Sequence, residues 1–264
     1  MGLMCSLLVS TYNWPEALEL CLTSVLKQTV LPAEIIIADD GSTDDTRVLI
    51  AKYQSISPVP IKHIWHEDQG FRKCLILNKA IHQVSKDYIV QIDGDIILNR
   101  NFIEDHIAVA EKGCFVRGTR TLITEAMATE VLSNKKIDFH FYSKGLRNRF
   151  NAIRIPFLAG LLTKRLLSGA NVRGCNMAYW KTDFIKVNGY NNDLQGWGHE
   201  DEELAIRLVN SGVLKKAIKW RCIQYHIHHK LASREQEFVH HQKLDAVRVK
   251  RLIECEFGYK ESVF

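Results

Sequence analysis

The sequence predicts an α/β fold in which a mainly parallel sheet carries helices on both faces. Short apolar runs rich in Val and Ile alternate with segments of helical periodicity throughout the first half of the chain. Such alternation is typical of an open parallel sheet whose crossover connections are helices. A composition of 46% hydrophobic and 25% charged residues provides enough apolar surface for a well-buried core.

The expected elements follow from local pattern. Asn13 can cap a helix that has Pro15 in its first turn, and 34–38 is a β-branched run. We expect strands at 5–9, 34–38, 61–65, 88–92, 114–118 and around 217–223, and helices beginning at Asn13 and covering about 43–53, 72–84, 101–112, 200–211 and 234–256.

Polar clusters follow four of these runs, at 10–13, 39–42, 66–70 and 93–95. In open α/β sheets, ligands collect just beyond the carboxyl ends of the strands. We therefore expect the four clusters to converge on one edge of the sheet and to form a ligand site there.

The most direct metal candidate is Asp93-Gly94-Asp95. Two carboxylates that follow an apolar strand can bind Mg²⁺ or Mn²⁺, which keep open positions for phosphate oxygens. The alternative interpretation is an ordinary Asp–Gly turn.

A second candidate is Gly196-Trp197-Gly198-His199-Glu200-Asp201. Trp197 between two glycines can present its indole face to a sugar, and Glu200 or Asp201 can bind hydroxyls or deprotonate one. The alternative is an acidic helix N-terminus that complements the helix dipole.

The group His226, His228 and His229 follows a strand-like run. In a continued strand, His226 and His228 would share one face and His229 would lie on the other. Imidazole tolerates Mn²⁺, so one of the three can complete a site begun by Asp95. The pattern leaves open which one.

Two further clusters suit a nucleotide. Asp39 or Asp40 can bind a ribose hydroxyl or a base imide, or else the segment is a turn and helix cap. The segment 67–73, with Arg72 and Lys73 opening a helix, can meet a diphosphate, or else both cations face solvent.

Two blocks carry a resemblance to known families. The run LLVSTYNWPEALELCLTSVLKQTVLPAEIIIADDGSTDDT, followed by QIDGD, resembles the inverting family 2 glycosyltransferases of the GT-A fold over about residues 4–105. The block RGCNMAYWKTDFIKVNGYNNDLQGWGHEDEEL is similar to the carboxyl-terminal motif of β-1,4-galactosyltransferases and chondroitin-type polymerases. The resemblance implies a single domain, with a nucleotide-sugar half at 1–118, an acceptor and metal half at 119–233 and a helical tail at 234–264.

The resemblance also implies a role for each matching residue. Thr11 and Tyr12 would flank the base, Asp40 (or Asp39) would bind uracil or ribose, Asp68 and Arg72 would contact nucleotide and phosphates, Asp93 would touch ribose or metal, Asp95 would be the main carboxylate ligand, His228 is the chosen histidine ligand, Trp197 would line the cleft, Glu200 would bind sugar hydroxyls, and Asp201 would be the base. Relatives usually carry glycine where this chain has His199.

The implied reaction moves a hexose or N-acetylhexosamine, with inversion, from a UDP-sugar to a hydroxyl of a glycan or lipid-linked acceptor. Mn²⁺ or Mg²⁺ would assist, in bacterial surface polysaccharide or lipopolysaccharide synthesis. A nucleotidyltransferase of similar fold and a non-catalytic sugar-nucleotide-binding module remain alternatives. No motif supports nucleic-acid binding.

Seven scattered cysteines predict reduced, mostly buried thiols, and the absence of a signal peptide or an apolar span predicts a cytoplasmic protein. The segment 139–182 contains no Asp or Glu but many Lys and Arg beside apolar residues. It predicts either peripheral contact with an anionic membrane or a helical lid with a solvated basic rim.

Overall fold

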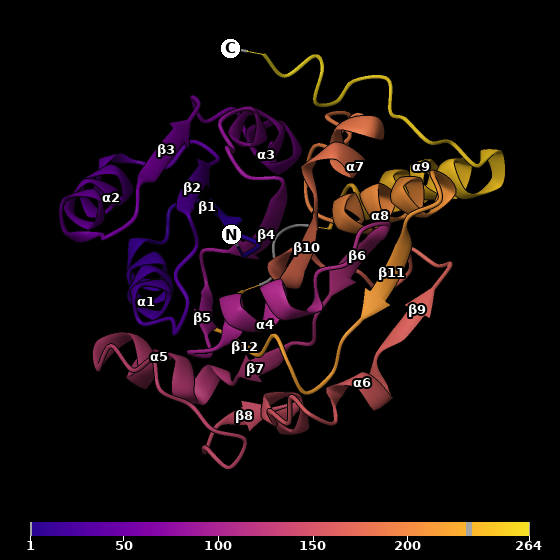
Figure 1. Ribbon diagram of the computed structural model, residues 1–264. Coiled ribbons are helices and arrows are strands. Elements are labelled where there is room, and N and C mark those ends of the chain that lie inside the picture. Colours follow the sequence, from indigo (N-terminus) through magenta and orange to yellow (C-terminus); the bar gives the residue numbers. More distant parts are fainter. Residues whose placement is uncertain (1, 231–233, 264) are drawn as a thin grey trace.

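The computed structural model describes residues 2–230 and 234–263, and it has two sheets (Figure 1). The large sheet has the strand order β3-β2-β1-β4-β10-β6-β11-β9. Its strands are β1 (Cys5–Thr11), β2 (Glu34–Asp39), β3 (Ile61–Trp65), β4 (Tyr88–Asp93), β6 (Cys114–Arg117), β9 (Lys164–Leu166), β10 (Met177–Trp180) and β11 (Leu214–Ala217).

The small sheet has the order β5-β12-β7-β8, with β5 (Ile96–Leu98), β7 (Thr121–Ile123), β8 (Leu146–Arg147) and β12 (Gln224–His226). The helices are α1 (Pro15–Leu26), α2 (Asp44–Ile56), α3 (Lys73–His82), α4 (Phe102–Val109), α5 (Glu125–Ser133), α6 (Ala159–Leu162), α7 (Lys181–Lys186), α8 (Glu200–Asn210) and α9 (Glu237–Lys250), with 3₁₀ turns η1 (Arg149–Ala152) and η2 (Gly174–Asn176).

Helices cover both faces of the large sheet, which confirms the predicted fold class. Alternate residues of β1 and β2 belong to different apolar clusters because successive strand side chains point to opposite faces. Leu7 and Ile35 pack with α1, α2 and α4, whereas Leu8 and Ile36 pack with α3, α7 and α8. β3, β2, β1 and β4 are parallel, and β10 then pairs antiparallel to both β4 and β6.

The chain crosses from the large sheet to the small one after β4, after β6 and after β11. The buried side chain of Asn176 joins the last two crossings, because its Nδ2 donates to the carbonyls of Thr119 and Cys222, each at 2.8 Å. Gly118 permits this approach, since a Cβ there would lie 2.3 Å from the Asn176 side chain.

Two expected elements differ from the structure. The predicted strand at 217–223 is wrong: β11 ends at Ala217 in one sheet and β12 begins at Gln224 in the other. Trp220 and Cys222, between them, both have positive φ. These two residues interrupt the extended conformation, so the segment 217–223 is a crossing between the sheets rather than one strand. In the tail, helix α9 ends at Lys250, earlier than predicted.

Within residues 2–230 and 234–263, no helix combines the length and apolar character needed to cross a membrane. All seven cysteine thiols are unpaired and six are buried, as the cysteine pattern predicted.

Candidate active site

The carboxyl ends of β1 and β4 meet, as predicted, around the Asp93 carboxylate. Its Oδ1 accepts hydrogen bonds from Ser10 Oγ and from Lys73 Nζ, both at 2.7 Å. Burial raises the pKa of Asp93, but Lys73 outweighs this effect and the net shift is downward. Asp93 is therefore held as a carboxylate in contact with a cation from the start of α3.

The two aspartates after β2 are engaged within the protein. Asp39 is fully buried, with Oδ1 accepting from the Ser42 backbone N–H and Oδ2 lying 2.8 Å from His63 Nε2. Asp40 is slightly exposed and contacts His66 Nε2 and the Arg72 backbone N–H. Both carboxylates stabilise the loops at this edge, and Asp39 has no exposed surface for a ligand in this arrangement.

Tyr12 and Asp68 lie together beside the same edge, because Tyr12 Oη donates to Asp68 Oδ2 at 2.9 Å. Hydrogen bonds from the Gly70 N–H and from Tyr12 lower the pKa of Asp68. Gly41, at φ 97°, allows the Asp68 backbone to approach, since a Cβ at Gly41 would lie 2.6 Å from the Asp68 Cα. The Arg72 guanidinium instead bonds to Gln69 and the Glu67 carbonyl, and Thr11 is buried.

A cluster suited to a metal ion lies at the ends of β4, β5 and β12. Ligand atoms of Asp95, His226 and His229 lie within 4.8 Å of one another. Asp95 Oδ2 is 3.4 Å from His226 Nε2 and 3.2 Å from His229 Nε2. Asp95 Oδ1 is buried and has no hydrogen-bond partner among the described residues. A buried oxygen without a donor is costly, so this donor set fits a divalent cation.

The histidine chosen from the sequence, His228, is exposed and lies outside this cluster. Strand β12 ends at His226, so the alternation of faces does not continue to 228 and 229. The chain beyond β12 instead turns His229 back toward Asp95. The structure therefore favours His226 and His229 over His228.

The Gly-Trp-Gly segment is a tight loop before α8. Gly196, Gly198 and His199 have φ of 94°, 115° and 68°. This region is open to glycine and strained for other residues, so His199 holds a backbone conformation that favours glycine. Trp197 is half-buried, and the Arg234 guanidinium lies 5.2 Å from its ring centroid.

Helix α9 contacts this loop through His240, whose side chain is 2% exposed. Its Nδ1 lies 2.8 Å from the Gly198 carbonyl oxygen, and its Nε2 lies 3.1 Å from that of Gln195. One imidazole thus contacts the backbone on both sides of Trp197.

The acidic start of α8 points into the site rather than to solvent. Glu200 is 6% exposed, and burial together with the charge of Asp201 raises its pKa from 4.5 to about 7. Burial opposes the charge of Lys73, but Asp93, Asp201 and Glu200 outweigh it and raise the Lys73 pKa. One buried ammonium therefore lies among carboxylates from distant parts of the chain.

Two donors fix the Asp201 carboxylate. Tyr190 Oη donates to Oδ1 at 3.0 Å, and the Gly174 backbone N–H donates to Oδ2 at 2.6 Å. Gly174 is required sterically, since a Cβ there would lie 2.4 Å from Asp201 Oδ1. Behind them, Gln91 Nε2 donates to Tyr190 Oη and Gln91 Oε1 accepts from Tyr179.

Sequence reasoning did not assign Gly174, Tyr190 or Gln91 to the site, and for Lys73 it left open contact with a diphosphate or exposure to solvent. Gly174 and Tyr190 both belong to the block that resembles galactosyltransferases, so their spacing was a usable signal. The signal at Gln91 was weaker: it is a polar residue within an otherwise apolar strand, and its side chain is fully buried.

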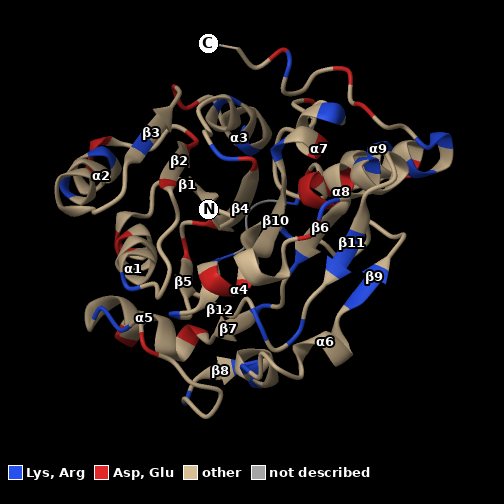
Figure 2. Ribbon diagram, in the orientation of Figure 1, with Lys and Arg blue, Asp and Glu red and all other residues tan. Residues whose placement is uncertain are grey.

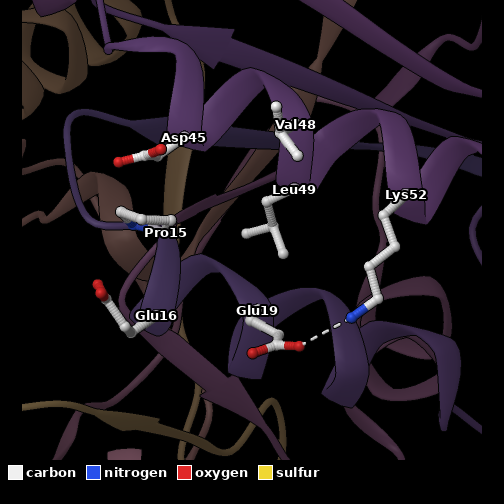
Figure 3. Close-up of a pocket in the computed structure, with 7 residues that line it drawn as sticks. All are labelled: Pro15, Glu16, Glu19, Asp45, Val48, Leu49 and Lys52. Atoms are coloured by element: carbon white, nitrogen blue, oxygen red, sulfur yellow. Dashed lines mark hydrogen bonds and ion pairs between the residues drawn. The ribbon is translucent and has the colours of Figure 1, made fainter.

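A groove of about 270 Å³ lies elsewhere, between α1 and α2 (Figure 3). Its lining includes Pro15, Leu49 and an ion pair of Glu19 with Lys52 at 3.2 Å. None of the site residues described above lines it, so it is not the candidate active site.

The fold is thus an α/β sheet with a carboxylate-rich site at its strand ends, beside a cluster of Asp95, His226 and His229 that suits a divalent cation. The model of glycosyl transferase family 2 matches residues 6–166, and that of the N-terminal domain of galactosyltransferase matches residues 161–230. The first match covers more than half of the chain, and the chain belongs to glycosyl transferase family 2.

Individual proteins agree with this membership. Chondroitin synthase of Escherichia coli is 22% identical over 242 residues, which cover 81% of this chain and 33% of the synthase. The chain thus spans about a third of that relative. Staphylococcus aureus TarS 1–349 in complex with UDP superposes with a TM-score of 0.61 at 15% identity, over 98% of this chain and 68% of that one.

A mannosyltransferase of Pyrobaculum calidifontis, in complex with GDP-Man and Mn²⁺, superposes with a TM-score of 0.64 at 17% identity, over 94% of this chain and 65% of that one. At these identities the two structures establish the fold, which is that of glycosyltransferases.

Proposed function

We propose that this protein transfers a hexose or N-acetylhexosamine from a UDP-sugar to a hydroxyl group of a glycan acceptor, with inversion at the anomeric carbon. The observation that carries the proposal is the meeting of three carboxylates from distant parts of the chain around Lys73. Asp93 comes from the nucleotide-binding half, whereas Glu200 and Asp201 begin α8, and all three act on the charge of Lys73.

The donor would lie along the carboxyl ends of β1, β2 and β4. Tyr12 and Asp68, both at this edge, are suited to the base and ribose, and the slightly exposed Asp40 is a better candidate than Asp39. The UDP complex of TarS and the GDP-Man complex of the mannosyltransferase support a nucleotide diphosphate donor. Uracil recognition in this chain is part of the proposal.

Asp95, His226 and His229 would hold Mn²⁺ or Mg²⁺, with Asp93 beside them. Two imidazole ligands favour Mn²⁺ over Mg²⁺, which is bound mainly by oxygen ligands. When bound, the cation supplies charge neutralisation for the departing diphosphate. Lys73, which donates to Asp93 Oδ1, adds a second positive charge nearby.

Asp201 would accept the proton of the attacking hydroxyl. The acceptor oxygen bonds to the anomeric carbon while the bond from that carbon to the diphosphate oxygen breaks, and the diphosphate leaves with the electron pair. The Tyr190 hydroxyl and the Gly174 N–H orient the Asp201 carboxylate for this step. Trp197 would pack against a sugar ring, and Glu200 would bind sugar hydroxyls.

A bacterial surface polysaccharide or lipopolysaccharide is the acceptor class that we infer, supported by the similarity to chondroitin synthase over a third of that protein. We further infer action on the cytoplasmic side of the membrane, with peripheral membrane contact.

The test is a screen of UDP- and GDP-sugars for thermal stabilisation and for Mn²⁺-dependent donor hydrolysis. We expect one UDP-sugar to raise the midpoint of thermal unfolding with Mn²⁺ present. Asp201→Asn should keep this stabilisation and lose turnover, whereas Asp193→Asn, at an exposed loop position, should change neither. Release of pyrophosphate from a nucleoside triphosphate and a sugar phosphate would instead support a nucleotidyltransferase.

A further inference from the structure

The edge of the molecule formed by β8, η1 and α6 exposes large apolar side chains. Phe150 in η1, Phe157 before α6 and Leu161 within α6 are 74%, 83% and 80% exposed. Isolated exposed apolar residues are common on protein surfaces. Three with this degree of exposure within twelve consecutive positions call for a partner that removes them from water.

Cations without carboxylate partners lie among these side chains. Arg147, Arg149 and Lys164 are exposed, and none makes an ion pair within residues 2–230 and 234–263. The stretch from 139 to 182 contains no Asp or Glu. Figure 2 shows blue segments at η1 and β9 along this edge. The charge of this surface is therefore uncompensated and suits an anionic partner.

A groove of about 430 Å³ opens beside α6, between it and α4. Its apolar lining includes Pro156, Phe157 and Gly160, and its cationic lining includes Arg221. The apolar and cationic lining residues together suit an anionic amphiphile, whose charged headgroup lies beside its chains.

The small sheet connects this edge to the metal cluster. Along one row of the sheet, His226 pairs with Leu122, and Leu122 pairs with Arg147. Neighbouring strands are about 4.8 Å apart, so the backbones of Arg147 and His226 are roughly 10 Å apart, at two strand spacings.

We propose that Arg147, Arg149, Phe150, Phe157, Leu161 and Lys164, here called the basic edge, bind the surface of an anionic lipid bilayer. Phe and Leu side chains insert at the boundary of headgroups and acyl chains, while Lys and Arg contact lipid phosphates. In conjunction with the proposed transferase function, this contact would hold the site beside a lipid-linked acceptor.

Lipid fits the basic edge better than a soluble anionic glycan. A polysaccharide would pair with the three cations but would leave the Leu161 side chain in water. A bilayer interface takes both kinds of group at once, and its attraction for cations adds to the burial of apolar area. Binding to a bilayer therefore requires the apolar side chains of the basic edge, whereas binding to a soluble glycan does not.

The experiment is co-sedimentation of the whole protein with vesicles of phosphatidylglycerol and phosphatidylcholine, compared with phosphatidylcholine alone. We expect binding to the anionic vesicles that weakens as salt increases. Each Lys or Arg near an anionic surface strengthens binding about fivefold, so Arg147→Gln with Arg149→Gln and Lys164→Gln should reduce the partition coefficient roughly 100-fold. A second variant, Phe150→Ser with Phe157→Ser and Leu161→Ser, should also lose binding.

Two matched variants control for charge and for exposed apolar area. Lys27→Gln with Arg100→Gln and Lys250→Gln removes the same charge from exposed positions elsewhere, and Val48→Ser with Ile56→Ser and Val249→Ser removes exposed apolar side chains from α2 and α9. Both should bind vesicles as the natural protein does.

The proposal is overturned by equal binding to neutral vesicles, by equal losses in the control variants, or by no vesicle binding at all. Binding of soluble hyaluronan that needs the cations but not Phe150, Phe157 and Leu161 would assign the edge to a glycan instead. Vesicle binding requires no turnover, and donor hydrolysis in the edge variants should stay unchanged. Failure of the transferase proposal would thus be seen separately.

Discussion

The buried Glu200 gives the sharpest physical prediction, for the change Glu200→Gln. The Glu200 pKa rises from 4.5 to about 7 on folding, because of burial first and the Asp201 charge second. Below pH 4.5 the folded and unfolded states both bind the proton. Between 4.5 and about 7 the folded state keeps the proton that the unfolded state releases, so the free energy of unfolding falls as pH rises through this window.

The magnitude follows from about 1.36 kcal/mol for each pH unit of difference. Between pH 5.5 and pH 8, the natural protein should lose about 2 kcal/mol relative to Glu200→Gln. The glutamine carbonyl can still accept from the Gly198 N–H, as the carboxylate does. The variant should therefore show a flatter pH dependence and become relatively more stable toward pH 8.

Urea unfolding at pH 5.5 and pH 8, followed by circular dichroism, measures this difference directly. Glu130→Gln on α5, where the side chain is exposed, is the control and should leave the pH dependence unchanged. A Glu200→Gln variant whose stability relative to the natural protein is the same at both pH values would refute the account of a buried, protonated Glu200.

Three other substitutions test the site. His229→Ala should weaken Mn²⁺ binding 10-fold or more by isothermal titration calorimetry, on the order expected for loss of a ligand, while the exposed His228→Ala should not; equal effects would contradict the cluster. Asp201→Asn should reduce kcat by about 10²–10⁴ with the fold intact by circular dichroism; near-normal turnover would exclude it as the base. His240→Ala removes the contact with the Gly198 carbonyl and should cost about 1–3 kcal/mol of stability and raise KM; an unchanged KM would mean that the loop does not need this support.

The local pattern predicted the first half of the fold closely. Strands at 61–65 and 88–92 agree with β3 and β4 to within a residue, because β-branched runs are local signals. The predicted cap at Asn13 was wrong: Trp14 precedes α1, and the Asn13 side chain accepts from the Thr43 backbone N–H instead. The convergence of Ser10 and Asp93 followed from a general rule on parallel sheets, and the structure confirms it. The pairing of strands that are distant in the sequence could not be predicted in this way. No local pattern indicated that β10 pairs antiparallel to β4.

The site residues divide in the same way, into those that a local pattern predicts and those that depend on the tertiary fold. Asp95 was predicted to be a metal ligand because its carboxylate follows a strand. The position of His229 beside Asp95 could not be predicted, because it depends on β12 ending at His226. For Lys73 the sequence left open contact with a diphosphate or exposure to solvent, and it did not predict the interaction with Asp93 and Asp201, which are 20 and 128 positions away. Whether a charge is buried is a tertiary property, and it is fixed here by the packing of α3 and α8 on the same face of the large sheet.

The amide of Asn176 links the two halves of the candidate site. His226 ends a strand of the small sheet, whereas Asp201 lies at the start of a helix packed on the large sheet. Two of the crossings between the sheets, after β6 and after β11, are hydrogen-bonded to this one amide. The Asn176 amide therefore couples the position of the proposed metal cluster to that of the proposed base, although it belongs to neither.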